Sequence, residues 1–227
     1  MARMAKKRRD HIFTKRGAAT RQRIVETAAR LVYEQGARGT SLDDVMERSR
    51  TSKSQLYHYF DNKDALLRAV IQWQTERIIG AQSRAAPDLG SFEALKRWGD
   101  RVVASVIESE GRGGCPLGSL ASELADHSEK ARMLLGESFS LWAGEIERGL
   151  QAMKAAGDLL PDANPQELAL ATMTALQGGK LLAQTQRSEH PLRLAMDMAI
   201  GNIARHLAPK RAIRKRRALG PGPSRRG

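Results

Sequence analysis

The sequence has little of several things that mark other classes of protein. It contains one cysteine, Cys115, so an intrachain disulfide is excluded. Aromatic residues make up 4% of the chain, and no run of Val, Ile, Thr and aromatic residues alternates with period two, as a half-buried strand would. Ala, Leu, Arg, Glu, Gln and Met are abundant instead, and these residues favour helix. We therefore expect an all-α protein.

Long apolar runs are also lacking. A membrane-spanning helix needs about 18 apolar residues, and the apolar run 168–176 is too short and is followed by Gln177. The basic N-terminal segment is not followed by an apolar stretch of the length found in signal peptides. These features predict a soluble, cytoplasmic protein with no membrane partner.

Clusters of residues that could carry chemistry are scarce. No His/Cys pair has the spacing of metal ligands, and neither a phosphate-binding loop nor a nucleotide fingerprint is present. The five histidines are scattered, at His11, His58, His127, His190 and His206. We expect that the protein is not an enzyme and needs no cofactor or metal.

Acidic residues are almost missing from the two ends of the chain. Residues 1–23 hold nine Lys or Arg and one acid, and residues 209–227 hold eight Lys or Arg and no acid. The formal net charge of +13 therefore lies in the two ends. Such segments attract a polyanion without reading its sequence, although solvated ends with no partner are the simpler interpretation.

Apolar periodicity and capping residues predict a helical organisation throughout. We assign residues 1–19 to a basic disordered arm, 20–66 to a helix-turn-helix domain, 67–208 to a helical effector-binding and dimerisation domain, and 209–227 to a basic disordered tail. The expected helices cover 20–35, a short segment from Ser41, a short segment from Ser52, 63–85, 92–108, 117–125, 129–156, 166–184 and 192–207.

The segment 20–60 has the pattern of a helix-turn-helix. One long helix precedes two short ones, each of which begins with a capping-box pattern: Ser41 with Asp44, and Ser52 with Gln55. A short helix that is braced in this way can enter the major groove of DNA, where each base pair presents a distinct pattern of donors and acceptors.

Residues 51–60 (TSKSQLYHYF) and 62–67 (NKDALL) resemble the DNA-binding signature of TetR-type (tetracycline-repressor-type) bacterial regulators. The resemblance covers about residues 20–70 and implies a homodimeric repressor that binds a palindromic operator on the bacterial nucleoid and is released by a small-molecule effector. It also implies roles at the DNA. Lys53, Ser54 and Tyr57 would lie closest to bases, while the residues at or near the phosphates would be Ser41, Arg50, Ser52, Gln55, His58, Tyr59 and Lys63.

Two features of this segment leave alternatives open. Arg50 stands where the family usually has Gly in the turn, and a left-handed Arg costs about 1 kcal/mol. Either the turn differs slightly from the family's, or Arg50 is tolerated because its cation reaches DNA. The aromatic residues Tyr57 and Tyr59 could be core residues rather than DNA contacts, and we interpret Phe60 as core.

The last two expected helices suit a dimer interface, as they do in TetR-type regulators. Small residues permit close helix approach on one helix, and apolar residues line the other, although the same residues could form an intrachain core. The predicted interface consists of Leu168, Ala171, Thr172, Ala175, Gly178, Leu194, Met198 and Ile203.

The middle helices are expected to enclose an effector pocket. Cys115 lies where a loop meets a helix start, which can lower the pKa of a thiol, so it could sense electrophiles or oxidants; a buried structural cysteine is the alternative. The predicted lining residues are Leu95, Trp98, Val102, Cys115, Leu117, Phe139, Trp142, Met173 and Gln177.

One different function competes with the regulator. A sequence-neutral architectural protein would coat DNA through its basic ends and depend little on residues 53–59.

Overall fold

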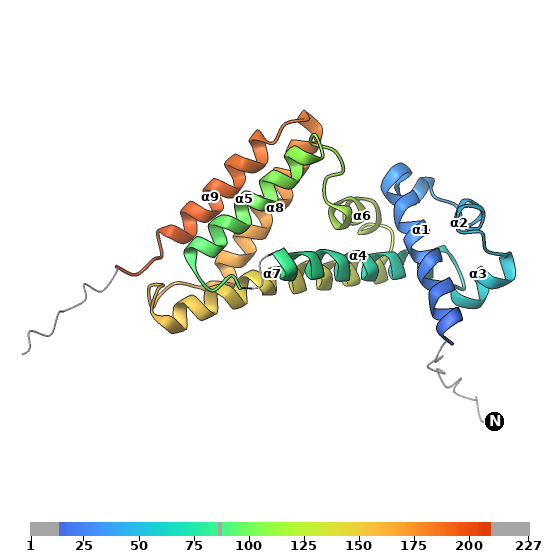
Figure 1. Cartoon of the computed structure of the whole chain (residues 1–227), viewed down its shortest axis with the longest axis horizontal. Helices are drawn as coiled ribbons and strands as arrows, with labels where there is room; N and C mark the ends of the chain where they lie inside the picture. The colour runs from blue at the N-terminus through green and yellow to red at the C-terminus, as the bar shows by residue number, and fades with distance from the viewer. Residues whose placement is uncertain (1–13, 86–87, 210–227) are drawn as a thin grey trace, which may run out of the picture.

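The computed structural model describes residues 14–85 and 88–209, and these ranges form nine α-helices. The N-terminal helices α1, α2 and α3 gather at one end of the molecule, and α4 leads from them to the remaining helices (Figure 1). The all-α prediction is confirmed. The helices are α1 (Lys15–Gly39), α2 (Leu42–Ser49), α3 (Lys53–Tyr59), α4 (Lys63–Ala85), α5 (Phe92–Glu108), α6 (Pro116–Leu124), α7 (Glu129–Ala156), α8 (Pro165–Gln186) and α9 (His190–Ala204).

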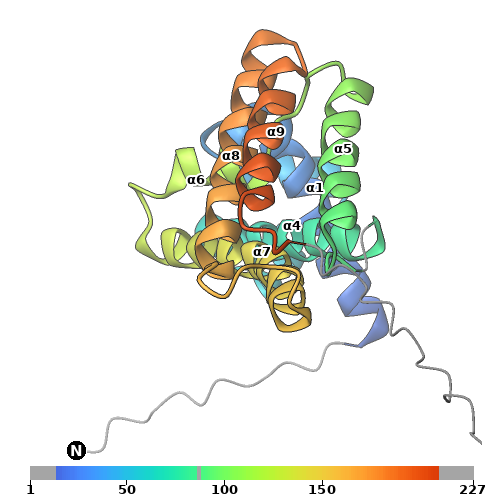
Figure 2. The same cartoon turned by 90° about the vertical axis from the view of Figure 1, so that its left-hand side faces the viewer.

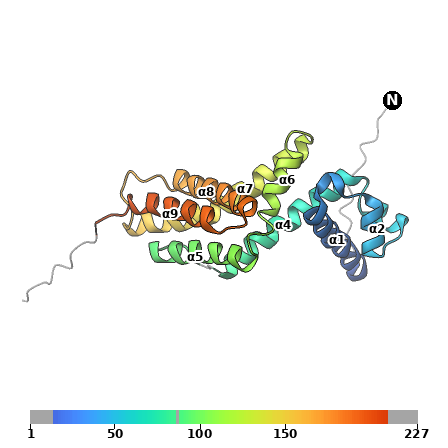
Figure 3. The same ribbon diagram turned by 90° about the horizontal axis from the view of Figure 1, so that it is seen from above.

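Two long helices connect the ends of the molecule. Helices α4 and α7 pack along each other, α8 and α9 form the most extensive helix pair, and α5 packs on α9 (Figures 1 and 2). Seen from above, α1–α3 form a lobe that joins the rest through α4 and α6 (Figure 3). Within the described ranges, no helix combines the length and apolar character needed to cross a bilayer.

Helix α1 begins earlier than its periodicity predicts. The Thr14 hydroxyl accepts a hydrogen bond from the Gly17 N–H at 3.2 Å and caps the helix. Residues 15–19, assigned to a disordered arm, are therefore helical, while 1–13 and 210–227 lie outside the described residues. Gly36 interrupts the helix as expected, because its φ of 80° is left-handed.

Helix α9 ends earlier than predicted. It stops at Ala204, and the following residues turn back to the connection between α7 and α8, where Leu207 pairs with Leu159 in an isolated antiparallel bridge. The Leu160 N–H donates to the His206 carbonyl at 2.8 Å. Helical periodicity cannot reveal this pairing, because the partner lies far away in the sequence.

Candidate nucleic-acid interface and ligand cavity

Helix α3 is only seven residues long and depends on its cap and on one anchor. The Ser52 hydroxyl accepts from the Gln55 N–H at 3.2 Å, and the Ser52 N–H donates to Gln55 Oε1 at 2.9 Å, which confirms the capping box. Leu56 is fully buried beneath the helix, a contribution of about 2 kcal/mol. The cap and the buried Leu56 together fix the direction in which the opposite face of α3 points.

That opposite face presents the three residues predicted to lie near bases together with His58, which is predicted to touch a phosphate. Lys53, Ser54, Tyr57 and His58 are all exposed, and they occupy one side of α3. Tyr57 is 44% exposed, so it is not a core aromatic. The structure therefore brings the predicted base contacts together on one surface, and their contact with DNA stays a prediction.

The other two aromatic residues of this segment face differently. Phe60 is 3% exposed and belongs to the core, as expected. Tyr59 is half-buried, packs against the core and meets the His58 ring edge-on at 4.9 Å between centroids. Tyr59 thus combines a packing role with a partly accessible ring.

The turn between α2 and α3 adopts the strained form that the family pattern implied. Arg50 has φ 52° and ψ 49°, the left-handed conformation, and its N–H closes the turn on the Glu47 carbonyl at 3.2 Å. Arg23 donates from Nε to the Ser49 carbonyl at 3.0 Å. The Arg50 side chain is exposed, so its charge is available to a phosphate.

Several predicted phosphate contacts also have structural roles. The Ser41 hydroxyl accepts from the Asp44 N–H at 3.0 Å, and both Ser41 donors bond the Asp44 carboxylate. The hydroxyl first, and then the backbone N–H, of Ser41 lower the pKa of Asp44. Lys63 donates from Nζ to the Arg38 carbonyl at 3.2 Å. Ser41, Ser52, Gln55 and Lys63 therefore stabilise the domain whether or not they also touch DNA.

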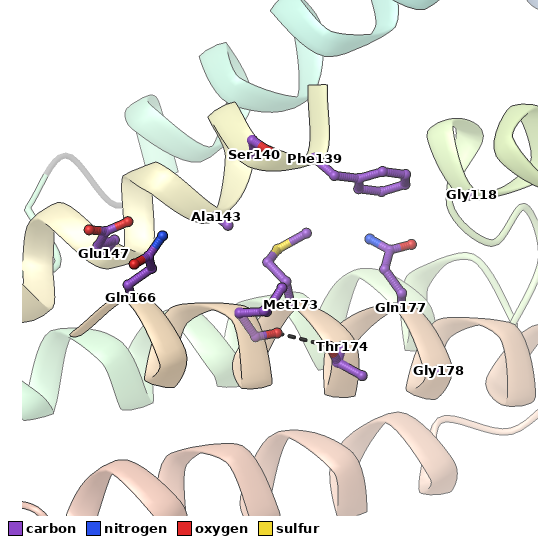
Figure 4. Close-up of a pocket in the computed structure, with 11 residues that line it drawn as sticks. Gly118, Phe139, Ser140, Ala143, Glu147, Gln166, Met173, Thr174, Gln177 and Gly178 are labelled. Carbon is purple, nitrogen blue, oxygen red and sulfur yellow. Dashed lines mark hydrogen bonds between the residues drawn. The ribbon is translucent and has the colours of Figure 1, made fainter. Parts of the chain in front are cut away.

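A cavity of about 740 Å³ lies between α7 and α8 and reaches α6 (Figure 4). Gln177 and Phe139 lie at its α6 end, Glu147 and Gln166 at the other end, and Met173 between them. It is large enough for a small organic ligand. The lining residues are Gly118, Phe139, Ser140, Ala143, Glu147, Gln166, Leu170, Met173, Thr174, Gln177 and Gly178.

Three of the nine predicted pocket residues line this cavity: Phe139, Met173 and Gln177. The other six side chains pack elsewhere, and their contact with an effector stays a prediction. Trp142 lies on the far side of α7, where its indole N–H donates to Gln82 Oε1 of α4. The residues that do not line the cavity are Leu95, Trp98, Val102, Cys115, Leu117 and Trp142, of which all but the half-buried Val102 are buried.

Cys115 is buried and serves as the N-cap of α6. Its Sγ accepts from the Gly118 N–H at 3.4 Å. This placement favours the structural interpretation of the residue. The polar lining residues Ser140, Glu147 and Gln166 were missed because they look like solvent-facing positions of amphipathic helices.

The predicted dimer face divides into two groups. Ala171, Gly178, Leu194 and Met198 are exposed, and Ala175 is half-buried. Leu168, Thr172 and Ile203 are buried within the single chain, which favours the alternative of an intrachain core for these three residues. The Thr172 hydroxyl donates to the Leu168 carbonyl within α8.

Three large apolar residues of α8 were missed. Leu170, Leu181 and Leu182 are 62%, 63% and 49% exposed. Leu194 and Met198 of α9, which packs on α8, are exposed as well, and we call these five exposed residues the α8–α9 surface. Consecutive apolar residues could have indicated the three residues of α8, because a helix cannot bury all of a consecutive apolar run on a single face.

A capped recognition helix on a three-helix domain, joined to a helical domain that holds a cavity, defines a helix-turn-helix regulator of transcription. Comparisons with known proteins agree. Residues 24–70 match the family model "Bacterial regulatory proteins, tetR family", and residues 91–198 match "Transcriptional regulator LmrA/YxaF-like, C-terminal domain". The chain belongs to the TetR family.

The relatives are named as regulators rather than as enzymes. The HTH-type transcriptional regulator YxaF of Bacillus subtilis is 30% identical over 183 residues, which are 80% of this chain and 93% of that protein. The HTH-type transcriptional repressor DhaR of Mycobacterium sp. strain GP1 is 25% identical over 76% of this chain and 86% of its own length.

Solved structures share the fold. A TetR-family regulator from Cytophaga hutchinsonii superposes with a TM-score of 0.71 at 24% identity, covering 87% of this chain and all of that one. The reduced form of Escherichia coli NemR gives a TM-score of 0.69 at 19% identity, with 84% and 97% covered.

Proposed function

We propose that the protein is a repressor that binds a palindromic operator as a homodimer through α3 and leaves it when a small molecule occupies the α7–α8 cavity. The observation that carries the proposal is the face of α3 formed by Lys53, Ser54 and Tyr57, which is exposed while Leu56 anchors the helix from behind. Side chains held in this way can discriminate bases by about 1–3 kcal/mol for each good contact.

Dimerisation is supported by the α8–α9 surface. Five large apolar side chains, each close to or above half exposed, gather on two helices that pack on each other. An exposed apolar patch on a water-soluble chain indicates an interface. Two copies would place two α3 helices on two half-sites, which lie about 34–36 Å apart when they are one turn of B-DNA apart.

Contacts between the two domains support regulation. Helix α4 packs against both α1 and α7, and the Arg38 N–H at the end of α1 donates to Glu123 Oε2 of α6 at 3.1 Å. A ligand that favours a different arrangement of α6 and α7 would therefore move α1 and change the separation of the recognition helices. By linkage, such a ligand lowers operator affinity.

The test is selection of bound sites from random DNA with the purified protein. We expect an enriched palindrome, and release of that DNA by a ligand of the cavity. Enrichment of no sequence, or equal competition by scrambled DNA, would contradict the proposal and support the sequence-neutral alternative.

Removing the basic ends would distinguish the sequence-specific repressor from the sequence-neutral architectural protein. A protein lacking residues 1–13 and 210–227 should keep its sequence preference while its affinity and the salt dependence of binding decrease. Binding that disappears altogether, for every sequence, would favour the architectural alternative.

A further inference from the structure

The cavity contains a buried donor that the described part of the chain leaves without an acceptor. Gln177 Nε2 is inaccessible to solvent and has no hydrogen-bond partner there. Its amide points toward the space beside Phe139 (Figure 4). A buried N–H without an acceptor is unfavourable, so a ligand whose acceptor meets Nε2 after a rotation of the Gln177 side chain gains more than it would at a solvated amide.

The walls of the cavity are mostly apolar. Phe139, Ala143, Leu170 and Met173 supply aromatic, aliphatic and thioether surface. A thioether makes favourable contacts with aromatic rings, so the middle of the cavity suits an aromatic body.

Ser140 and Thr174 also line the cavity between its ends, and the Thr174 hydroxyl already donates to the Leu170 carbonyl (Figure 4). The amide of Gln177 and the carboxylate of Glu147 are therefore the groups that we take to select the ligand.

The far end carries the negative charge. Glu147 is the charged residue among the described lining residues, and its Oε1 accepts from Gln151 at 2.8 Å. Its carboxylate can accept a further hydrogen bond from a hydroxyl or amine and disfavours an anion. Phe139 and Glu147 are eight residues apart on α7, a rise of about 12 Å along the helix.

We infer that the ligand of this cavity is an elongated aromatic molecule, neutral or cationic, with a carbonyl-type acceptor for Gln177 at one end and a hydroxyl or amine donor for Glu147 at the other. The inference rests on the proposed function in taking this cavity as the effector site, and it adds the chemical class of the effector and the two residues that select it.

A matched series of biphenyl probes tests the inference by calorimetry on the full-length protein. 4-Acetyl-4′-hydroxybiphenyl carries both groups, 4-hydroxybiphenyl lacks the acceptor, and 4-acetylbiphenyl lacks the donor. We expect the first to bind about tenfold more tightly than either of the others, the effect of one hydrogen bond. 4′-Hydroxybiphenyl-4-carboxylate, an anion, should bind more weakly than the acetyl compound.

Two methionine variants assign each preference to its residue. Gln177→Met should reduce the advantage of the acetyl group from about tenfold to about onefold and leave the hydroxyl advantage intact, and Glu147→Met should do the reverse. Gln186→Met, the same change at an exposed position at the end of α8, should retain both preferences. Thermal melting monitored by circular dichroism verifies that each variant is folded.

Equal affinity of the wild-type protein for the three neutral probes, tighter binding of the anion, or no binding of any probe overturns the inference. Operator release is measured separately with the selected DNA. Probes that bind with the expected preferences but leave the DNA bound support the ligand chemistry and contradict the proposed release mechanism. Release by compounds that ignore Gln177 and Glu147 supports the mechanism and contradicts the chemistry.

Discussion

Tyr57 is 44% exposed and Phe60 is 3% exposed, although both are aromatic and three residues apart. Leu56 and Phe60 face the core together because they are four residues apart on one helical stripe, and this leaves Tyr57 on the outer face. At the scale of single residues, the inward side chains of this segment stabilise the fold, and the outward side chains are the ones available to DNA.

Replacing Tyr57 should therefore affect binding and not folding. Tyr57→Ala should weaken binding to the selected operator by about tenfold or more, since it would remove the proposed base contact, and change stability by less than about 0.5 kcal/mol. Fluorescence anisotropy and thermal melting measure the two effects. Leu56→Ala is the contrasting variant and should lower stability by about 2–5 kcal/mol. Unchanged operator affinity in Tyr57→Ala would remove this residue from the recognition surface.

The Asp44 carboxylate gives a second prediction at this scale. Its pKa is lowered by the hydrogen bonds from Ser41, so its stabilising effect is complete above the pKa of the unfolded chain and is lost as the pH falls through the lower folded value. Ser41→Ala removes the larger of these bonds and should raise the pKa of Asp44 toward the ordinary aspartate value, as carboxyl NMR titration would show.

Glu129 serves as the internal reference for that titration. Arg132 lowers its pKa through a hydrogen bond on α7, far from α2, so Ser41→Ala should leave it unchanged. A pKa of Asp44 that does not move would show that the capping box is not what lowers it.

At the scale of helices, the glycines of α7 show where a neighbouring segment leaves no room for a side chain. Gly149 of α7 lies against the connection before α5, where an added Cβ would be 2.6 Å from the Leu89 carbonyl oxygen. Gly136 of the same helix is exposed, and an added Cβ would have nothing within 4 Å. Steric contact with Leu89 therefore limits what can replace Gly149, whereas helix propensity alone decides the effect of replacing Gly136.

Substitution of these two glycines should have opposite effects on stability. Gly149→Ala should lower the free energy of unfolding by about 1–3 kcal/mol through overpacking. Gly136→Ala should raise it by about 0.5–1 kcal/mol, because alanine is the better helix former. Chemical denaturation measures both, and a stabilised Gly149→Ala would mean that the contact with Leu89 is loose.

At the scale of the whole molecule, the α8–α9 surface consists of large apolar side chains that the single chain leaves exposed to water. Leu194 and Met198 are 53% and 66% exposed on α9, and Leu181 of α8 is 63% exposed. Leu170 and Gly178 belong both to the exposed side of α8 and to the lining of the cavity. A partner copy on this surface would therefore cover part of the cavity opening.

Charge on this surface should prevent the proposed dimer from forming. Leu194→Glu combined with Met198→Glu should yield folded monomers in sedimentation equilibrium, and operator affinity should fall by about a hundredfold or more because two half-sites are no longer held together. Met133→Glu, at a position 62% exposed on α7 near the N-terminal domain, is the matched control and should stay dimeric. Dimers that persist in the double variant would exclude this surface as the interface.

The recognition domain could be predicted closely from local signals. The capping boxes at Ser41 and Ser52 and the buried stripe through Leu56 and Phe60 act over a few residues, so the sequence alone contains them. The sequence leaves the left-handed conformation of Arg50 open, because only the family resemblance points to it. The ends of α1 and α9 could not be predicted as well. The cap at Thr14 is also local but lies before the apolar stripe that marked the helix, whereas the pairing of Leu207 with Leu159 joins residues far apart in the sequence.

The sequence by itself determined which stretches are helical and which face of α3 is polar, because those properties depend on neighbouring residues. Only the tertiary structure decided where the cavity lies and which apolar residues of α8 remain exposed. Leu168 and Leu170 are chemically alike, yet one is 5% and the other 62% exposed. An apolar side chain loses water against any apolar partner, so its burial depends on where distant helices pack rather than on its own identity.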